Sequence, residues 1–221
     1  MKNNVCKVSE MDIKKEYKDE FYKEIVHTNN LRCQIVLISL CVIDIIWMIL
    51  NFSNIDTDYY LSILMFIFEV AGIFTLFFAK NKRYIGAINL SIIAMCLIWA
   101  QYVNFSNYEY TGNFIPYLIS LLGLASIACL KPKHSIILFA TNQLVFLIIN
   151  SILIKDISTL VNVCLNSTIG VIFACIFSIF NFKSKLHLFL NKKLVVELNL
   201  VNEKLKEYTP TWGLGFANQY Y

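Results

Sequence analysis

Long runs of apolar residues, separated by short polar segments, occur six times along this sequence. The runs are rich in Ile, Leu, Phe and Val, and they lack the apolar-polar alternation of β-barrel strands. Each run has roughly the length, about 20 residues, that a helix needs to cross a bilayer. Helices also satisfy the backbone of separate spans inside lipid, so the pattern predicts an all-α, polytopic membrane protein. The six predicted transmembrane helices cover residues 33–50, 59–79, 84–102, 114–130, 135–154 and 157–182.

The composition supports this prediction. Hydrophobic residues make up 57% of the chain and charged residues 15%, against about 45–50% and about 25% in soluble domains. A chain of this composition cannot bury its apolar surface in one water-soluble core, so the lipid bilayer is the first predicted partner. The net charge of +4 does not indicate nucleic acid binding, because the basic residues lie in short segments next to the apolar runs.

The basic residues fall almost entirely on one side of the predicted spans. Of the 19 Lys and Arg residues, 18 lie before the first span, in the second and fourth connections, or after the sixth span. Only Lys155 lies in an opposite connection. Cytoplasmic connections carry an excess of Lys and Arg. The sequence therefore predicts a multi-pass protein of the inner (cytoplasmic) membrane with both termini in the cytoplasm.

Aromatic residues gather near the predicted outer ends of the spans, and they include Trp47, Tyr59, Trp99 and Tyr102. Trp and Tyr are enriched where the membrane meets water. The pattern indicates an interfacial belt, although chance clustering in an aromatic-rich chain would give the same distribution.

The segment that precedes the first span is charged but periodic. Ile13, Tyr17, Phe21 and Ile25 are spaced by four residues, which places them on one face of a helix. The sequence thus predicts a cytoplasmic amphipathic helix within residues 1–32. Its apolar face would lie on the membrane surface or against a second copy of the helix, and a solvated helix without a signalling role is the alternative.

A heptad-like pattern follows the sixth span. Leu194, Leu198, Val201, Leu205 and Tyr208 follow a 4, 3, 4, 3 spacing, as in the apolar seam of a parallel coiled coil. His187 and Asn191 continue this seam upstream, and a buried Asn in such a seam sets register and oligomeric state. Residues 183–208 are therefore predicted to form a cytoplasmic signalling helix that makes a homodimer, with a single helix on the membrane surface as the alternative.

The last residues of the chain carry a family resemblance. Leu214, Gly215, Asn218 and Tyr221 stand where the catalytic domain of GGDEF-family diguanylate cyclases has Leu, Gly, Asn and Phe in its opening motif. Trp212 replaces the Asp of that motif, no Thr separates Leu214 from Gly215, and Gln219 replaces an Arg. With the spans and the predicted coiled coil, the chain resembles the membrane sensory region of these bacterial enzymes.

The patterns along the chain, together with the resemblance, divide it into four segments. These are an amphipathic helix in residues 1–32, a six-helix transmembrane sensor in 33–182, a signalling helix in 183–208, and a degenerate or truncated start of a GGDEF domain in 209–221. The cyclic di-GMP synthesis of the family is not expected here, because the GGDEF signature and its metal-binding carboxylates are missing. The chain is expected to be either a truncated product or a partial sequence. Membrane histidine kinases share the architecture, but His187 lacks the acidic neighbour of their phosphorylated histidine.

No residues form a complete catalytic, cofactor or metal site. The sequence has no Walker A motif, no G-x-S-x-G and no H-E-x-x-H. His27, His134 and His187 are too dispersed for a metal site, and the seven cysteines include no C-x-x-C pair. We therefore expect no catalytic residue, no cofactor and no metal.

Two acidic residues, Asp44 and Glu69, lie inside predicted spans, where ionisable groups are costly enough to indicate function. At about 1.5 Å per residue, Asp44 lies about 9 Å and Glu69 about 15 Å below the outer ends of their helices. Amides in the outer halves of other spans add to a possible polar pocket, whose candidate residues are Asp44, Glu69, Gln101, Asn150, Asn162 and Asn166. The alternative is interhelical hydrogen bonding, worth about 0.6 kcal/mol per contact.

Two classes of function remain after this reading. A sensory module would detect a ligand or a change in the bilayer and pass it to the helix at 183–208. A small transporter or channel would also use a helical bundle with intramembrane acids, but transporters often show internal repeats and broken spans, and no repeat is visible here. The sequence therefore favours the sensor, with a non-functional remnant as the third possibility.

Overall fold

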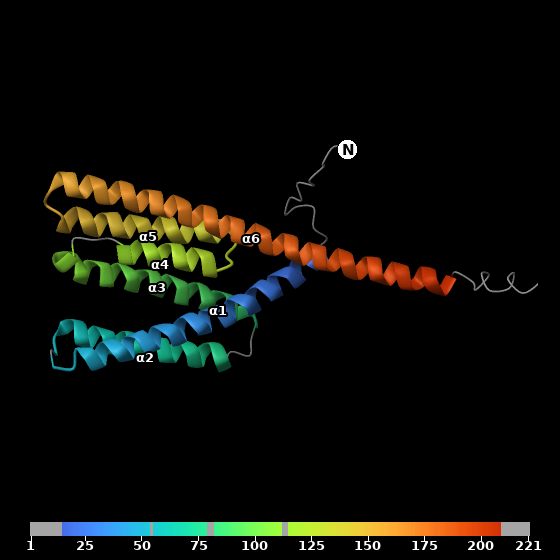
Figure 1. The fold of residues 1–221 in the computed structure, drawn as a ribbon, viewed down its shortest axis with the longest axis horizontal. Helices are drawn as coiled ribbons and strands as arrows, with labels where there is room; N and C mark the ends of the chain where they lie inside the picture. The colour runs from blue at the N-terminus through green and yellow to red at the C-terminus, as the bar shows by residue number, and fades with distance from the viewer. Residues whose placement is uncertain (1–14, 54, 79–81, 112–114, 209–221) are drawn as a thin grey trace, which may run out of the picture. The chain divides into compact units, whose positions relative to one another are not determined.

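The computed structural model describes residues 15–53, 55–78, 82–111 and 115–208, and each regular element within them is an α-helix (Figure 1). The helices are α1 Lys15–Leu50, α2 Thr57–Phe78, α3 Lys82–Thr111, α4 Ile115–Ile127, α5 Pro132–Leu153 and α6 Ile157–Tyr208. In these ranges five helices are long and apolar enough to cross a membrane, and α4 is a shorter apolar helix. The prediction of an all-helical fold is confirmed for these residues, and the apolar helices are compatible with a multi-pass membrane protein.

The outer surface of the helices is apolar, as a bilayer requires. Large side chains such as Ile49, Phe77, Ile152 and Phe180 are more than two-thirds exposed. Water would penalise such a surface at about 25 cal/mol per Å2, whereas lipid tails are as apolar as these side chains. The exposed apolar surface therefore supports a bilayer as the environment of these helices.

Two predicted boundaries differ from the observed helices at the ends of the chain. The amphipathic segment and the first span form one uninterrupted helix, α1, and the sixth span and the predicted signalling helix form another, α6. Phe21 and Ile25, on the apolar face of the amphipathic segment, are buried. The ring of Phe21 lies edge-on against Phe182 of α6, with 5.6 Å between centroids. The apolar face of the amphipathic segment was expected to lie on the membrane or on a second copy, but Phe21 packs on α6 of the same chain.

The fourth helix is shorter than the predicted run. α4 has 13 residues and is about 20 Å long, whereas the hydrocarbon core is about 30 Å thick. The residue before a proline is pushed out of the helical region, and Lys131, before Pro132, has φ −58° and ψ 139°. Asn29 also bonds both backbone groups of Cys129. Residues 128–131 therefore form a connection between two helices.

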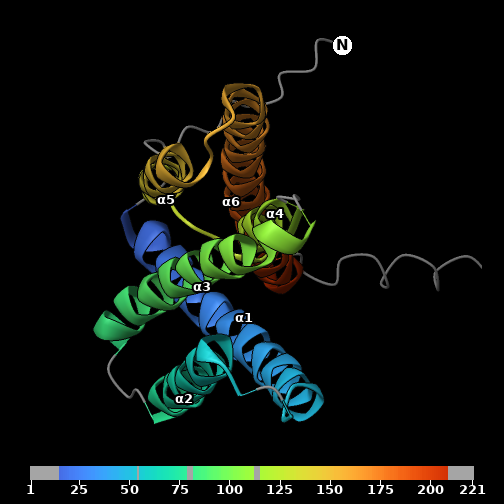
Figure 2. The same cartoon turned by 90° about the vertical axis from the view of Figure 1, so that its left-hand side faces the viewer.

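The chain divides into two compact units, Met1–Phe182 and Lys183–Tyr221. In the first unit, successive helices run in alternating directions (Figure 1). The end of α1, the start of α2 and the connection at 154–156 lie at one end of the helices, and the connection at 128–131 lies toward the other. Figure 2 shows α3 between the pair α1 and α2 on one side and α4 and α5 on the other. This position makes α3 the central helix of the unit.

An aromatic stack holds the centre of the first unit together. Tyr117 of α4 and Phe146 of α5 are fully buried, and their rings lie almost parallel with 4.1 Å between centroids. The ring of Phe105 from α3 also stacks on Phe146, with 5.6 Å between centroids. Aromatic pairs of this kind stabilise by about 0.5–1.5 kcal/mol beyond the area they bury. The stack thereby fixes α3, α4 and α5 against one another.

Candidate functional site

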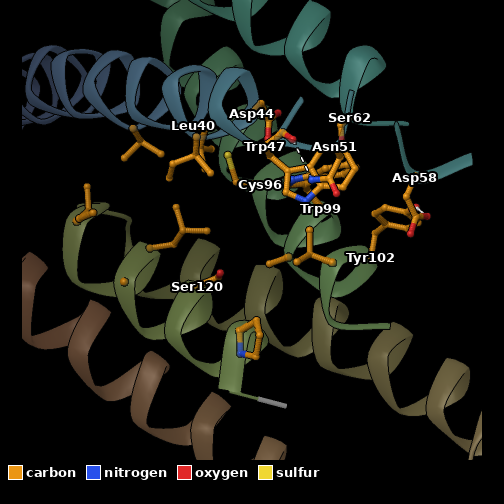
Figure 3. Close-up of a pocket in the computed structure, with 18 of the residues that line it drawn as sticks. Leu40, Asp44, Trp47, Asn51, Asp58, Ser62, Cys96, Trp99, Tyr102 and Ser120 are labelled. Atoms are coloured by element: carbon orange, nitrogen blue, oxygen red, sulfur yellow. Dashed lines mark hydrogen bonds between the residues drawn. The ribbon is translucent and has the colours of Figure 1, made fainter. Parts of the chain in front are cut away.

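A cavity of about 740 Å3 lies between α1, α3 and α4 and reaches the start of α2 (Figure 3). Its volume is within the range of about 300–1,000 Å3 that is usual for small-molecule sites. The lining changes along the helices. Asn51, Asp56, Asp58 and Ser62 line the end near the α1–α2 connection, and the lining at the other end is apolar. The cavity thus offers a polar and an apolar region to one occupant.

Among the acidic side chains that line this cavity, Asp44 is the one that belongs to α1 (Figure 3). It is only 8% exposed, and its Oδ2 atom has no hydrogen-bond partner. No Lys, Arg or His is among the described residues that line the cavity. A buried carboxyl group without a partner is costly in a membrane span. Asp44 is therefore the residue of the cavity that most clearly lacks a counterpart.

Aromatic side chains form another part of the lining beside Asp44. Trp47 lies one turn further along α1, and Trp99 and Tyr102 come from α3 (Figure 3). The rings of Trp99 and Tyr102 stack with 5.0 Å between centroids and 28° between planes. The Tyr102 hydroxyl donates a hydrogen bond to Oδ1 of Asp58, which joins α3 to the first turn of α2. Trp47, Trp99 and Tyr102, which the sequence predicted to belong to an interfacial belt, therefore line the cavity.

Glu69 lies near Asp44 but outside the cavity. Its side chain is completely buried, and no N–H or O–H group of the described residues donates a hydrogen bond to either carboxyl oxygen. The Cys41 thiol, a weak donor, lies beside it, and Asp44 is close enough to act on it electrostatically. The structure thus brings the two predicted acids into one neighbourhood of α1 and α2. Only Asp44 faces the cavity.

The amides predicted for the same pocket are distributed elsewhere. Gln101 and Asn150 are buried, and the Asn150 side chain bonds the Phe146 carbonyl of its own helix. Asn162 and Asn166 are exposed on α6. None of these four residues lines the cavity. Their distribution follows from the rotation of each helix about its axis, which the apolar runs do not reveal.

A chain of buried hydrogen bonds crosses the first unit from α3 to α6. Gln101 donates to Oδ1 of Asn142 at 2.7 Å, and Asn142 donates to the Tyr117 hydroxyl at 3.0 Å. The Tyr117 hydroxyl donates to Gln143 at 3.2 Å, and Gln143 donates to the Ser167 hydroxyl of α6 at 2.8 Å. Asn142 and Gln143 were not predicted as site residues, although two adjacent amides in an apolar run are a visible signal.

Three side chains from other helices hold the end of α4. Asn29 of α1 donates to the Cys129 carbonyl at 2.8 Å and accepts from its N–H at 2.9 Å. Arg32 of α1 donates to the Ile127 carbonyl, and Asn181 of α6 donates to the carbonyls of Ser126 and Ala128. The last carbonyls of a helix lack partners within the helix, and these side chains supply them. From the sequence, Arg32 was expected only to be one of the basic residues that set the orientation in the membrane.

α4 also packs closely on α6. A Cβ atom added at Gly170 of α6 would lie 2.5 Å from Cδ2 of Leu118, whereas one added at Gly123 of α4 would meet nothing within 4 Å. Gly170 therefore allows close approach of the two helices, while Gly123 borders the open cavity. One face of α4 lines the cavity, and another contacts α6.

The predicted residues of the signalling helix lie in the second unit. Leu194, Leu198, Val201 and Leu205 are each more than half exposed, and Asn191 is exposed as well. Off the seam, Val195, Val196 and Leu200 are also exposed. The Tyr208 side chain, the C-terminal GGDEF-like residues 209–221 and Ile13 fall outside the described part of the chain. Within that part, the second unit consists of one helical segment.

Comparison with known proteins does not extend these findings. No family model matches the chain, and no curated protein or solved structure matches it either. Among the residues that the structure describes, no group of three or more His, Cys, Asp or Glu could hold a metal ion.

Proposed function

We propose that this chain is a membrane-embedded sensory and signal-transducing module of the kind that precedes the catalytic domain of GGDEF-family diguanylate cyclases. The observation that carries the proposal is the single helix α6, which has 52 residues. At about 1.5 Å per residue it is about 78 Å long, far more than the roughly 30 Å of a hydrocarbon core. Its first half is bonded into the helices around the cavity, and its second half bears the heptad pattern.

The contacts around α4 supply a route from the cavity to α6. An occupant of the cavity would contact α4 at Ser120 and Leu124. α4 contacts α6 at Leu118 and Gly170 and bonds it through Asn181. Because α4 packs on α6 and is hydrogen-bonded to it, a shift of α4 would also act on α6.

The proposed orientation has six crossings and cytoplasmic termini. The connection that contains Lys131 lies toward the end of the first unit where α1 begins, and the starts of α2 and α6, next to Asp56 and Asp156, lie at the opposite end (Figure 1). The excess of Lys and Arg on cytoplasmic connections then places the polar mouth of the cavity outside. α4 takes part as a short crossing whose last carbonyls are satisfied by Asn29, Arg32 and Asn181.

The output is proposed to be a parallel homodimer of the segment 183–208. Leu194, Leu198 and Val201 are exposed in the single chain, and their 4, 3 spacing matches a coiled-coil seam. Two copies would cover these side chains. A dimeric output suits an enzyme family in which two substrate-loaded domains must meet, as the resemblance implies.

The test follows the output helix while the cavity is altered. A nitroxide at Leu198→Cys, in a background without native cysteines, reports the distance between the two copies in lipid nanodiscs. Filling the cavity by Gly123→Leu is expected to change the distance distribution. The control Ala140→Leu adds the same side chain on the exposed face of α5 and should leave it unchanged. An identical distribution in all three proteins would contradict signal transmission.

A transporter or channel remains the competing class, and it makes a different prediction. Transport requires that solutes cross proteoliposome membranes in a protein-dependent way. For the sensor, we expect no such flux of a cavity ligand while the distance between copies responds to it. Flux without a distance response would favour the transporter.

A further inference from the structure

The cavity around Asp44 indicates the chemical class of its occupant. We propose that it binds a small organic cation with an apolar chain, an ammonium compound whose charge pairs with Asp44 and lies against Trp47 and Trp99. This inference rests on the proposed function only in treating the occupant as the stimulus. The binding itself can be tested separately.

The first argument is the missing partner of Asp44. Its Oδ2 atom is buried and unbonded, and Asp44 belongs to the lining of a cavity in which no described residue is basic. The mouth of the cavity adds Asp56 and Asp58, so the surrounding charge is negative. An anion would be repelled and a neutral apolar molecule would leave the carboxyl group unpaired. A cation supplies the partner that the chain itself does not.

The second argument is the aromatic lining. The rings of Trp47, Trp99 and Tyr102 border the same space as Asp44 (Figure 3). Aromatic faces attract cations, Trp most strongly, and groups of such rings bind quaternary ammonium ions. A carboxyl group beside indole rings therefore favours a diffuse organic charge over a metal ion. A metal ion would need several oxygen ligands, and the described residues contain no such cluster.

The third argument is the size and the apolar end of the cavity. A volume of about 740 Å3 is much larger than an ammonium group alone. Val36 and Leu40 of α1 and Leu124 and Ile127 of α4 contribute the apolar lining away from the mouth. Val36 lies eight residues before Asp44, or about 12 Å along the helix. A chain of several methylene groups on the cation would bury its surface there.

Such a cation can come from water or from the bilayer, because some lipid headgroups are ammonium groups. The test uses hexyltrimethylammonium and the full chain in nanodiscs of phosphatidylglycerol, a lipid without an ammonium group. A Trp212→Phe background leaves Trp47 and Trp99 as the only tryptophans, so that tryptophan fluorescence reports on the cavity. We expect a saturable fluorescence change with hexyltrimethylammonium, and none with hexanesulfonate or heptanol.

Two variants test the assignment. Asp44→Asn keeps the shape and removes the charge, so the affinity should fall at least about tenfold, whereas Asp156→Asn, outside the cavity, should leave it unchanged. Gly123→Leu keeps Asp44 but fills the space, and it should also weaken binding. Nanodiscs that contain phosphatidylethanolamine distinguish the sources: a reduced probe affinity means that the lipid amine occupies the cavity, and an unchanged affinity means a water-borne ligand.

Several outcomes would overturn the inference. These are equal affinities of the unsubstituted chain and Asp44→Asn, a neutral alcohol that binds as tightly as the cation, or no saturable binding in the unsubstituted chain. If Asp44→Asn does not insert into the membrane, the ligand series and Gly123→Leu still decide. Cation binding with an unchanged distance between copies at position 198 would contradict the proposed function while this inference stands. If filling the cavity changes the distance but the cation does not bind, the inference of a cation ligand is contradicted while the proposed function stands.

Discussion

Single polar side chains carry much of the specificity of the first unit, because its apolar residues resemble the surrounding lipid. Tyr117 shows this best: its hydroxyl accepts from Asn142 and donates to Gln143, and its ring stacks on Phe146. Ser135 and Ser178 form a second buried link between α5 and α6 at 2.6 Å. Van der Waals packing and hydrogen bonds drive helix association within membranes, so such contacts select which helices meet.

The substitution Tyr117→Phe tests this role at the residue scale. It keeps the stacked ring but leaves one donor of Asn142 and one acceptor of Gln143 without partners. We expect a loss of about 1 kcal/mol in the free energy of unfolding, measured by SDS titration of the protein in mixed micelles. Tyr60→Phe, at an exposed position, is the control. Equal stabilities of the two variants would show that the hydrogen-bond chain does not contribute.

At the scale of elements, α4 and α6 depart most from simple spans. α4 ends early because Pro132 imposes an extended conformation on Lys131 and because Asn29 offers its side chain to the Cys129 backbone. α6 begins at a capping residue, since Asp156 accepts from the N–H and the hydroxyl of Thr159. The same bonds lower the pKa of Asp156 below its ordinary value. Polar side chains thus set the ends of both helices.

The neighbours Asn29 and Asn30 provide a matched test of the α4 end. Asn29→Leu removes both bonds between the Asn29 side chain and the Cys129 backbone, at a cost of about 1–3 kcal/mol. In Asn30, the side-chain oxygen is buried without a partner, so Asn30→Leu should be neutral or stabilising. Thermal unfolding in detergent compares the two. A greater loss for Asn30→Leu would contradict the assignment of Asn29 as the cap.

For α6, crosslinking tests the dimer at the predicted seam. Cysteine at Leu198 should form a disulfide between copies more readily than cysteine at Asn202, four residues on and off the seam. Replacing Leu198 and Leu205 by Asp is expected to abolish dimers trapped by cysteine at Leu194 while membrane insertion persists, since both positions lie outside the apolar spans. Crosslinking without this periodicity, or dimers that survive the double change, would contradict the coiled coil.

At the scale of the whole molecule, the distribution of charge and the alternation of helices make one prediction about topology. In a background without native cysteines, Asp56→Cys should react with an impermeant thiol reagent added to intact cells. Lys133→Cys should react only after the cells are opened, because the basic connections are expected in the cytoplasm. Reaction at Lys133 but not at Asp56 would reverse the orientation and place the mouth of the cavity inside.

Much of the architecture was predictable from the sequence because its causes are local. An apolar run of sufficient length must be helical in lipid, whatever its neighbours are. The runs therefore predicted the apolar helices that the structure contains. The spacing of Leu194, Leu198 and Val201 predicted a coiled-coil seam from the sequence of one chain alone. The end of α4 was harder to predict, because Asn29 lies 100 residues away from the backbone that it bonds.

The candidate site depended on tertiary structure. The sequence indicated that Asp44, Glu69 and Asn166 are polar residues within spans, but only packing decided that Asp44 faces a cavity, Glu69 is enclosed and Asn166 is exposed. The reason is geometric: successive residues of an α-helix are rotated by about 100°. In a uniformly apolar run, no amphipathic stripe defines that rotation. The neighbours of each helix define it, and with it which polar groups meet.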